Sequence, residues 1–338
     1  MTNSCLYLES GYLNFDYILA KKAAFNIIIG GRGIGKTYGC LSYFLKAGQP
    51  FLLLRRTQTQ CDIVSNPLFN PLKGVADDAG IEIQIKPIPK TKSTQTLSAE
   101  GELLSVNAAL STFANLRGWD GRAIKSIVYD EFIPSPGERT IKDEGLALLH
   151  CYETISRNRE IQSGEVLPLF LLANAFDTAA DTLRVLGVAE AIEKMYRKHQ
   201  EEKLIRRGSH LIYIVLPKSP ISAAKAGTAL YDVANDDFKK LSLENTDIYI
   251  TDRRKHVILT EYTLKCTTDD FEVYRHKSRS EYFIKAYAGS KCQNHYTRDP
   301  RGRRNFARSK KRYLDMYIKG KVFFDANLTE RIFIEWYT

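Results

Sequence analysis

The chain has 338 residues, a formal net charge of +10, and ordinary globular proportions of hydrophobic (44%) and charged (26%) residues. This length accommodates two domains, and this composition excludes wholesale disorder. The six cysteines form no C-x-x-C pair, and no apolar run approaches the ~18 residues of a membrane span. We therefore expect a soluble protein of a reducing compartment, with neither a zinc site nor a membrane partner. The positive charge fits a polyanionic partner, or equally a basic protein that has none.

Apolar runs alternate with helix-like stretches through the first two-thirds of the chain. The expected strands are Phe25–Ile29, Phe51–Leu54, Ile81–Ile85, Ile124–Tyr129 and Leu167–Ala173. The expected helices are Lys36–Lys46, with Gly48 as its C-terminal cap, and Gly145–Arg159. Several strands are continuously apolar, as strands covered on both faces of a parallel sheet are. The alternation predicts a doubly wound α/β domain over residues 1–217.

The first expected strand leads into a segment that fits the phosphate-loop pattern G-x-x-x-x-G-K-[ST]. Its residues are Gly30, Gly31, Arg32, Gly33, Ile34, Gly35, Lys36 and Thr37. Glycines let backbone amides point at phosphates, the lysine neutralises β- and γ-oxygens, and the threonine hydroxyl ligates Mg²⁺. A glycine-rich turn with a chance Lys-Thr is the alternative. The strand before the loop and the helix after it favour an ATP and Mg²⁺ site.

Polar residues end the other expected strands of this domain. Asp130 and Glu131 follow Ile124–Tyr129. In additional-strand ATPases the first carboxylate holds the Mg²⁺ shell and the second polarises the attacking water. Because ligand sites of α/β sheets form at the carboxyl ends of strands, we expect this pair beside the phosphate loop. The alternative is a strand that simply ends in a polar turn.

Three further positions are candidates for sensing phosphate. Arg55 and Arg56 end the second strand and either contact nucleotide or form a solvated pair. Asn174 follows Leu167–Ala173, where a polar side chain can sense the γ-phosphate. Arg157 closes the helix after the acidic pair. It could reach a neighbouring subunit's ATP as an arginine finger, or simply stabilise a helix C-terminus.

The last third of the chain changes character. Residues 218–245 suit a linker or a small connecting module, and residues 246–338 a smaller α+β domain. Strands are expected there at Asp247–Thr251, His256–Tyr262, Phe271–Tyr274 and Tyr282–Tyr287. A dense basic stretch follows: Arg298, Arg301, Arg303, Arg304, Arg308, Lys310, Lys311 and Arg312. We expect it to contact a nucleic-acid backbone; a solvated loop or a patch docked on an acidic protein is the alternative.

The motif order GGRGIGKT, FLLLRRT, NLRGWDGRAIKSIVYDEF, ISRNRE and LFLLANA resembles the DNA-packaging ATPases of tailed bacteriophages. It is most similar to the short ATPases of small podoviruses that replicate by protein priming. The resemblance covers residues 1–217 and implies a terminase-like, additional-strand P-loop ATPase. It further implies a homomeric ring, typically a pentamer, on the portal vertex of an empty procapsid in the host cytoplasm. ATP hydrolysis would drive double-stranded DNA inward, and some relatives also bind a structural RNA.

The resemblance also implies roles for individual residues. Lys36 and Thr37 match the phosphate-loop positions, and Arg55 and Arg56 match the paired arginines after the second strand. The remaining matches are Asp130 to the metal carboxylate, Glu131 to the catalytic carboxylate, Arg157 to the trans-acting finger, and Asn174 to the motif that couples hydrolysis to movement.

Large terminases carry a ribonuclease-H-like nuclease after the ATPase, whereas the short podovirus enzymes keep that fold without its chemistry. A two-metal nuclease needs three or four carboxylates around cations about 4 Å apart. Asp325 is the best ligand candidate, while Asp252 precedes the competing cations of residues 253–255. Since no convincing cluster forms, we expect a nuclease-inactive domain. The other two functions to consider are a terminase with an active nuclease and an ATP-controlled nucleic-acid-binding switch.

Overall fold

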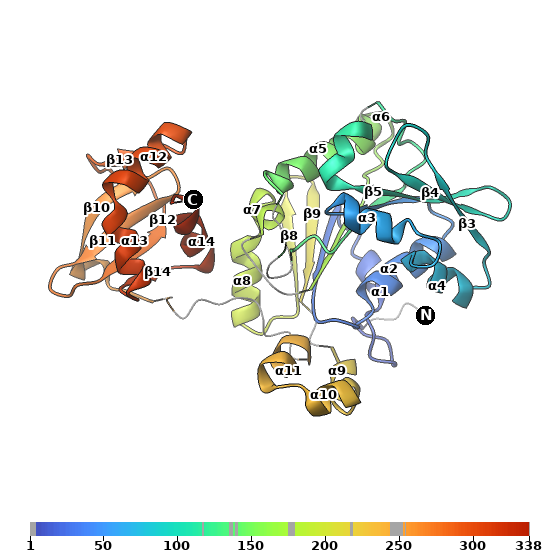
Figure 1. The fold of residues 1–338 in the computed structure, drawn as a ribbon, viewed down its shortest axis with the longest axis horizontal. Coiled ribbons are helices and arrows are strands. Elements are labelled where there is room, and N and C mark those ends of the chain that lie inside the picture. The colour runs from blue at the N-terminus through green and yellow to red at the C-terminus, as the bar shows by residue number, and fades with distance from the viewer. Residues whose placement is uncertain are drawn as a thin grey trace. The chain divides into compact units, whose positions relative to one another are not determined.

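The structure is a computed structural model that describes residues 5–116, 118–134, 138, 141–174, 180–216, 219–243, 253 and 255–337. The chain divides into two compact units, residues 1–248 and residues 249–338 (Figure 1). Within the described ranges, none of the helices has the length and apolar character needed to cross a bilayer.

The described part of the first unit forms a nine-stranded sheet in the order β3-β4-β5-β2-β6-β7-β1-β9-β8. The strands are β1 Phe25–Ile29, β2 Phe51–Arg55, β3 Ile83–Pro87, β4 Thr94–Ser98, β5 Leu103–Ala109, β6 Ser126–Asp130, β7 Leu169–Ala173, β8 Glu202–Arg207 and β9 His210–Val215. The strands from β5 to β9 in this order are parallel, and β3, β4 and β8 add antiparallel edges. Strand β7 lies between β1 and β6, which confirms the additional-strand α/β fold.

Helices cover both faces of this sheet. Their bounds are α1 Phe15–Leu19, α2 Lys36–Lys46, α3 Gln58–Val64, α4 Pro71–Asp78, α5 Glu144–Ser156, α6 Arg159–Ser163, α7 Asp181–Val185 and α8 Ala189–Arg197, with a 3₁₀ turn at Leu110–Leu116. Figure 1 shows α1, α2 and α4 on one face and α5, α7 and α8 on the other. A core layer on each side of a parallel sheet explains why its central strands are apolar throughout.

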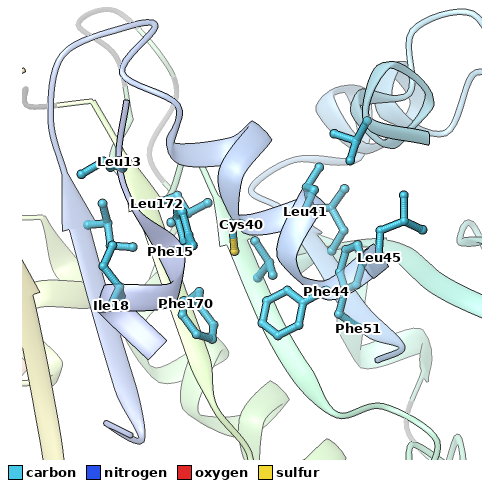
Figure 2. Packing of buried hydrophobic residues seen from close by; sticks show 14 of the residues in the cluster. Leu13, Phe15, Ile18, Cys40, Leu41, Phe44, Leu45, Phe51, Phe170 and Leu172 are labelled. Carbon is cyan, nitrogen blue, oxygen red and sulfur yellow. The ribbon is translucent and has the colours of Figure 1, made fainter. Parts of the chain in front are cut away.

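The helix after the phosphate loop is anchored by a helical stripe of apolar side chains. Cys40, Leu41, Phe44 and Leu45 of α2 are buried, at the spacing that places them on one face (Figure 2). The Phe44 ring lies 5.3 Å from that of Phe170 in β7 and 5.7 Å from that of Phe51 in β2. This packing fixes the first turn of α2 at the carboxyl edge of the sheet.

The predicted elements of the first unit agree with the structure to different degrees. Strand β1 and helix α2 are confirmed at both ends, and β2, β6 and β7 within two residues. The predicted strand Ile81–Ile85 begins later, at Ile83, and belongs to an antiparallel edge hairpin. The predicted helix Gly145–Arg159 is interrupted at Arg157, whose φ of 46° lies in the left-handed region, so that α5 and α6 are separate helices.

Residues 221–243 form three short helices within the first unit: α9 Ile221–Ala226, α10 Ala229–Val233 and α11 Asp236–Leu243. Tyr231 is buried, and its ring lies 6.0 Å from that of Phe238, which joins α10 to α11. The Asn235 side chain accepts a hydrogen bond from Phe238 N (2.9 Å) and caps α11. The segment expected to be a linker or a connecting module is thus a small helical module.

The second unit combines a five-stranded sheet, ordered β13-β10-β11-β12-β14 over the described residues, with helices. Its elements are a 3₁₀ turn Leu259–Glu261, β10 Tyr262–Thr268, β11 Phe271–His276, β12 Tyr282–Ala286, β13 His295–Tyr296, α12 Pro300–Ser309, α13 Lys311–Ile318, β14 Val322–Phe324 and α14 Asn327–Glu335. Strands β10, β11 and β12 are antiparallel, and β13 and β14 pair in parallel at the edges. The aromatic rings of Phe271, Phe306, Phe333 and Trp336 form the core.

Two strand predictions in this unit need comment. The predicted strand His256–Tyr262 is wrong, because the exposed Ile258 is followed by a 3₁₀ turn that begins at the exposed Leu259, and β10 begins only at Tyr262. The predicted strand Asp247–Thr251 lies outside the described residues. A ribonuclease-H-like origin of this unit stays a prediction.

Candidate functional site

The parallel arrangement brings the predicted polar residues to one edge of the first unit's sheet. The phosphate loop follows β1, Arg55 and Asp130 end β2 and β6, and Asn174 follows β7. These strands are neighbours in the order β2-β6-β7-β1, so their carboxyl ends lie side by side. This is where ligands bind in open α/β sheets.

Lys36 lies at the floor of the phosphate loop. It is the first residue of α2, is 8% exposed, and its Nζ donates to Gly30 O (2.9 Å), Gly31 O (2.7 Å) and Asn174 Oδ1 (3.0 Å). Burial lowers the pKa of this ammonium to about 8. All three hydrogen-bond partners are neutral, so an anion would stabilise the buried charge.

Thr37 and Asp130 place two oxygen ligands next to each other. The Thr37 hydroxyl donates to Asp130 Oδ1 (3.0 Å), and Asp130 Oδ2 lies 3.3 Å from Arg55 Nη2. Burial raises the pKa of Asp130, which Arg55 opposes, so a further cation beside this carboxylate would favour its charged form. Over the described residues no three His, Cys, Asp or Glu side chains gather as a metal site. One carboxylate and one hydroxyl suit Mg²⁺, which takes its remaining ligands from phosphates and water.

Glu131 leaves the end of β6 in a left-handed turn. Its φ is 58°, an uncommon value for a residue with a Cβ. Consecutive residues of a strand point to opposite faces, yet both Asp130 and Glu131 reach Arg55, because the turn redirects Glu131. Glu131 Oε2 lies 2.9 Å from Arg55 Nη1, and its side chain is 52% exposed.

Arg56 faces the other side of the sheet from Arg55. Its Nε and Nη2 donate to the two carboxylate oxygens of Glu144 in α5 (2.8 and 2.9 Å), and Nη1 lies 3.0 Å from Glu138. Tyr129 also donates to Glu144, and the Arg56 side chain is only 1% exposed. Its guanidinium is thus engaged inside the protein. We therefore reassign Arg56 from nucleotide contact to structural ion pair, whereas Arg55 lies among the candidate site residues.

Arg157 lies at the surface beyond the C-terminal end of α5. Its left-handed backbone ends the helix, and its Nη2 donates to Trp119 O (2.7 Å). Arg159 donates instead to Ile124 O (2.6 Å) and Gly121 O (3.2 Å), which ties α6 to the loop before β6. Arg157 is the more exposed of the two, and its action on a neighbouring subunit stays a prediction.

A cavity of about 950 Å³ lies between the N-terminal segment and α2 beside the phosphate loop. Its lining includes Leu8, Tyr12, Phe15, Gly33, Gly35, Tyr38, Tyr43 and Lys46. Leu13 N donates to Ile34 O (3.1 Å) and so ties this segment to the loop. Sequence reasoning named Gly33 and Gly35 but missed the other residues of this lining, because no local pattern marks Tyr12 or Tyr38 as a wall of a site assembled by the fold.

The basic stretch of the second unit forms an exposed cationic surface on α12 and α13. Arg301, Arg304 and Arg308 are spaced by three and four residues and therefore share one face of α12. With the exposed Lys311 and Arg312 of α13, they form what we call the basic face. In the part of the chain that the structure describes, none of these five side chains has an ion-pair partner.

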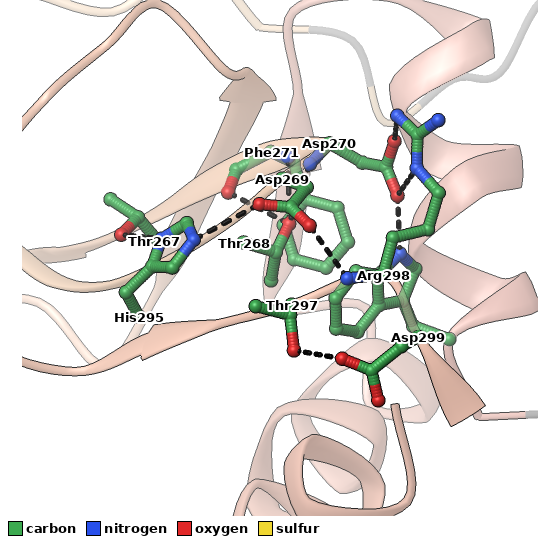
Figure 3. A network of polar contacts seen from close by, with 10 residues as sticks. Thr267, Thr268, Asp269, Asp270, Phe271, His295, Thr297, Arg298 and Asp299 are labelled. Carbon is green, nitrogen blue, oxygen red and sulfur yellow. Dashed lines mark hydrogen bonds and ion pairs between the residues drawn. The ribbon is translucent and has the colours of Figure 1, made fainter. Parts of the chain in front are cut away.

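The other three cations of the stretch have partners within the unit. Arg303 lies 5.7 Å from the Trp336 ring, and Lys310 lies 5.7 Å from the Tyr296 ring. Figure 3 shows Arg298 bonded through Nε to Asp270 Oδ2 (3.2 Å) and through its backbone N to Asp269 Oδ2 (2.7 Å). Because its charge is neutralised there, we assign Arg298 to fixing the turn between β13 and α12 rather than to the basic face.

Much of the first unit matches a known protein family. Residues 8–175 match the Podovirus DNA encapsidation protein (Gp16) family. The DNA packaging proteins of Bacillus phages PZA and phi29 are each 31% identical over 165 residues, which cover 47% of this chain and 45% of theirs. The chain thus spans less than half the length of these curated relatives. The DNA packaging protein of Bacillus phage B103 is 23% identical over 255 residues.

Solved structures share the fold at low sequence identity. The bacteriophage Phi-29 viral genome packaging motor assembly aligns with a TM-score of 0.65 at 19% identity, covering 96% of this chain and 98% of that one. The Phi-28 gp11 DNA packaging motor aligns with a TM-score of 0.60 at 16% identity, covering 97% and 98%.

Proposed function

Residues 8–175 place this chain in the podovirus DNA encapsidation protein family, and from that premise we propose that it is an ATP-hydrolysing motor that moves double-stranded viral DNA into a procapsid. The observation that carries the proposal is the convergence of Lys36, Thr37, Asp130, Glu131 and Asn174 at one sheet edge. Phosphoryl transfer needs these roles together: a phosphate cradle, a metal ligand and a group that orients water.

ATP binding uses the phosphate loop and the adjoining cavity. Lys36 neutralises the β- and γ-phosphates, which removes the cost of its buried and poorly compensated charge. The 950 Å³ cavity is large enough for a nucleoside, and Tyr12 and Tyr38 offer aromatic surfaces to the base.

Hydrolysis uses the acidic pair. Thr37 and Asp130 hold Mg²⁺, which when bound neutralises charge that develops on the phosphate oxygens. Glu131 accepts a hydrogen bond from the attacking water and orients it. It must first leave Arg55, and its exposed position leaves room for that movement.

Asn174 connects Lys36, which would bind the phosphates, to the end of β7. Its Oδ1 accepts from the same Nζ of Lys36 that would bind the phosphates. A change in the anion at Lys36 therefore alters the hydrogen bond that holds the end of β7. This is the contact through which we propose that hydrolysis is transmitted to movement.

The assembly we propose is a homomeric ring, typically a pentamer, attached to the portal of a procapsid in the host cytoplasm. Arg157 acts on the ATP of the neighbouring subunit. The basic face contacts the phosphate backbone of DNA, or of a structural RNA at the portal. Packaging double-stranded DNA of any sequence needs charge rather than base readout. The five cations of the basic face, which have no ion-pair partner among the described residues, supply that charge.

The test is steady-state ATP hydrolysis with and without long double-stranded DNA, by the wild type and by Glu131→Gln. We expect DNA-stimulated turnover in the wild type and its loss in Glu131→Gln, with ATP binding retained. Glu153→Gln is the matched control, since Glu153 is an exposed residue of α5. Normal turnover by Glu131→Gln contradicts the assignment of the catalytic carboxylate, and turnover indifferent to DNA contradicts the coupling.

A further inference from the structure

The helical module α9–α11 packs onto the phosphate loop. A Cβ added at Gly31 would lie 3.0 Å from Ser242 O of α11, and one added at Gly11 would lie 3.0 Å from Ile221 N of α9. Ile221 also packs against the core beside the loop. The module is thus held at both of its ends near the segment that would receive the phosphates.

One cation of this module reaches the loop itself. Lys225 of α9 donates a short hydrogen bond from Nζ to Arg32 O. The same Nζ would lie 3.1 Å from a Cβ at Gly33, whose φ of +73° and missing side chain leave the space open. Lys36 holds the carbonyls of Gly30 and Gly31, so two ammonium groups bond three successive carbonyls of one loop.

No described acidic side chain balances the charge of Lys225. Among the residues that the structure describes it has no ion-pair partner, and besides Arg32 O its neighbour is the Tyr231 ring, 5.9 Å away. Lys36 and Lys225 both bond carbonyls of the loop, and Arg32 is one of its residues, so three cations gather there. Three cations around one phosphate cradle favour an anion at that position.

We propose that Lys225 is a second triphosphate-binding lysine, which exchanges the carbonyl of Arg32 for the terminal phosphate of ATP in the same subunit. The inference rests on the proposed ATP site and adds to it a residue outside the phosphate-loop motif. Lys225 lies at the middle of the loop, next to the carbonyls held by Lys36, the residue that reaches the β- and γ-phosphates. It therefore distinguishes ATP from ADP, and it ties the module to the nucleotide only when the terminal phosphate is present.

The test compares the affinities of the full chain for a Mg²⁺-bound non-hydrolysable ATP analogue and for Mg-ADP, by calorimetry. We expect Lys225→Ala to lower the affinity for the ATP analogue about tenfold, because a charge-assisted hydrogen bond is lost. The affinity for ADP should change less than twofold. Lys225→Gln keeps a donor for Arg32 O but no charge, so it should fold normally and show the same selective loss. Lys225→Arg should retain most of the preference for the ATP analogue over ADP. Lys239 is a cation of α11, and Lys239→Ala should bind both nucleotides as the wild type does.

The outcomes separate a failure of the proposed role of Lys225 from a failure of the proposed ATP-binding function. Equal weakening of analogue and ADP, or no change in their ratio for Lys225→Gln, overturns the role of Lys225 while the ATP site stands. If the wild type binds neither nucleotide, or Lys36→Ala binds both as well as the wild type, the proposed function itself fails. If Lys225→Ala does not fold, Lys225→Gln and Lys225→Arg decide the question.

Discussion

Arg55 is ion-paired with Glu131, the carboxylate proposed to activate water, at 2.9 Å, and the same guanidinium lies 3.3 Å from Asp130. While this pair is formed, Oε2 of Glu131 is occupied by the Arg55 guanidinium. The Nε of Arg55 is buried without a hydrogen-bond partner among the described residues, so this guanidinium is not fully satisfied where it lies. We infer from these contacts a resting state of the proposed motor, in which Arg55 restrains the carboxylate proposed to orient water.

Removing the charge of Arg55 should therefore raise the rate of ATP hydrolysis in the absence of DNA. An ion pair whose acid is half exposed contributes about 1 kcal/mol, so Arg55→Gln should raise the DNA-free rate about fivefold and lower the stimulation by DNA. The measurement is ATP turnover at saturating ATP, with Arg122→Gln as the control, because Arg122 forms a surface pair with Asp120. A fall in the DNA-free rate would instead assign Arg55 to the phosphates.

The pKa of Lys36 predicts how ATP affinity depends on pH. Burial lowers this pKa to about 8, so the ammonium is charged below pH 8 and increasingly neutral above it. Phosphate favours the charged form, so binding raises the pKa and takes up a proton. Affinity should therefore fall as the pH rises through 8, by up to about tenfold per unit.

Calorimetry in two buffers of different ionisation enthalpy measures that proton directly at pH 8.5. Lys36→Arg is the matched control, since a guanidinium stays charged in this range and any remaining binding should take up no proton. Equal binding enthalpies in the two buffers for the wild type would refute the prediction.

The buried pair of Arg56 with Glu144 predicts a stability effect rather than a catalytic one. Removing one partner leaves an uncompensated buried charge, so Arg56→Ala should lower the free energy of unfolding by about 3–5 kcal/mol. Glu138→Gln removes only the half-exposed partner and should cost less than about 1 kcal/mol. Urea unfolding of both variants tests this. If Arg56→Ala is stable but no longer binds ATP, Arg56 contacts the nucleotide after all.

The sequence predicts the candidate site where the chemistry is local. Strand β1, the phosphate loop and α2 are continuous in the chain, so one motif with its flanking elements determines all three. Asp130, Glu131 and Asn174 follow apolar strands, and the rule that parallel strands end at one edge predicts that they meet there.

What the sequence does not predict depends on which side chains face each other across the fold. Arg55 and Arg56 are adjacent and chemically alike, yet the alternation of strand faces separates them, and Glu144 that receives Arg56 is far away in the chain. Lys225 lies in a segment whose small residues indicate a linker, and only its packing brings it to the loop. Strands β4 and β8 carry polar residues, so they lack the apolar run by which β1 and β7 are predicted.

The basic face predicts a measurable salt dependence. Arg301, Arg304 and Arg308 share one face of α12 and lack ion-pair partners among the described residues, so replacing all three with Ala should weaken binding of double-stranded DNA. If each neutralises one phosphate, the slope of log affinity against log salt should become less steep by about 2.7. The control replaces the exposed Arg275, Lys277 and Lys291 of the same unit, which removes equal charge. Equal losses in both triple variants would show that net charge, rather than this face, governs binding.

The proposed role of Arg157 predicts that two inactive variants recover ATPase activity when they are mixed. If it acts as a finger across an interface, Arg157→Ala should lower turnover about 10³-fold while its own phosphate loop stays intact. Lys36→Ala lacks a working loop but retains its arginine, so mixed rings pair a good site with a good finger and should recover ATPase activity. Arg159→Ala serves as the comparison, because Arg159 is bonded to the loop before β6 within its own chain and should not be rescued by mixing. The two variants are mixed before assembly, and gel filtration should verify that they co-assemble. An absence of recovery in verified mixed rings would place Arg157 in a role within its own subunit, where its bond to Trp119 O and its left-handed backbone hold the end of α5.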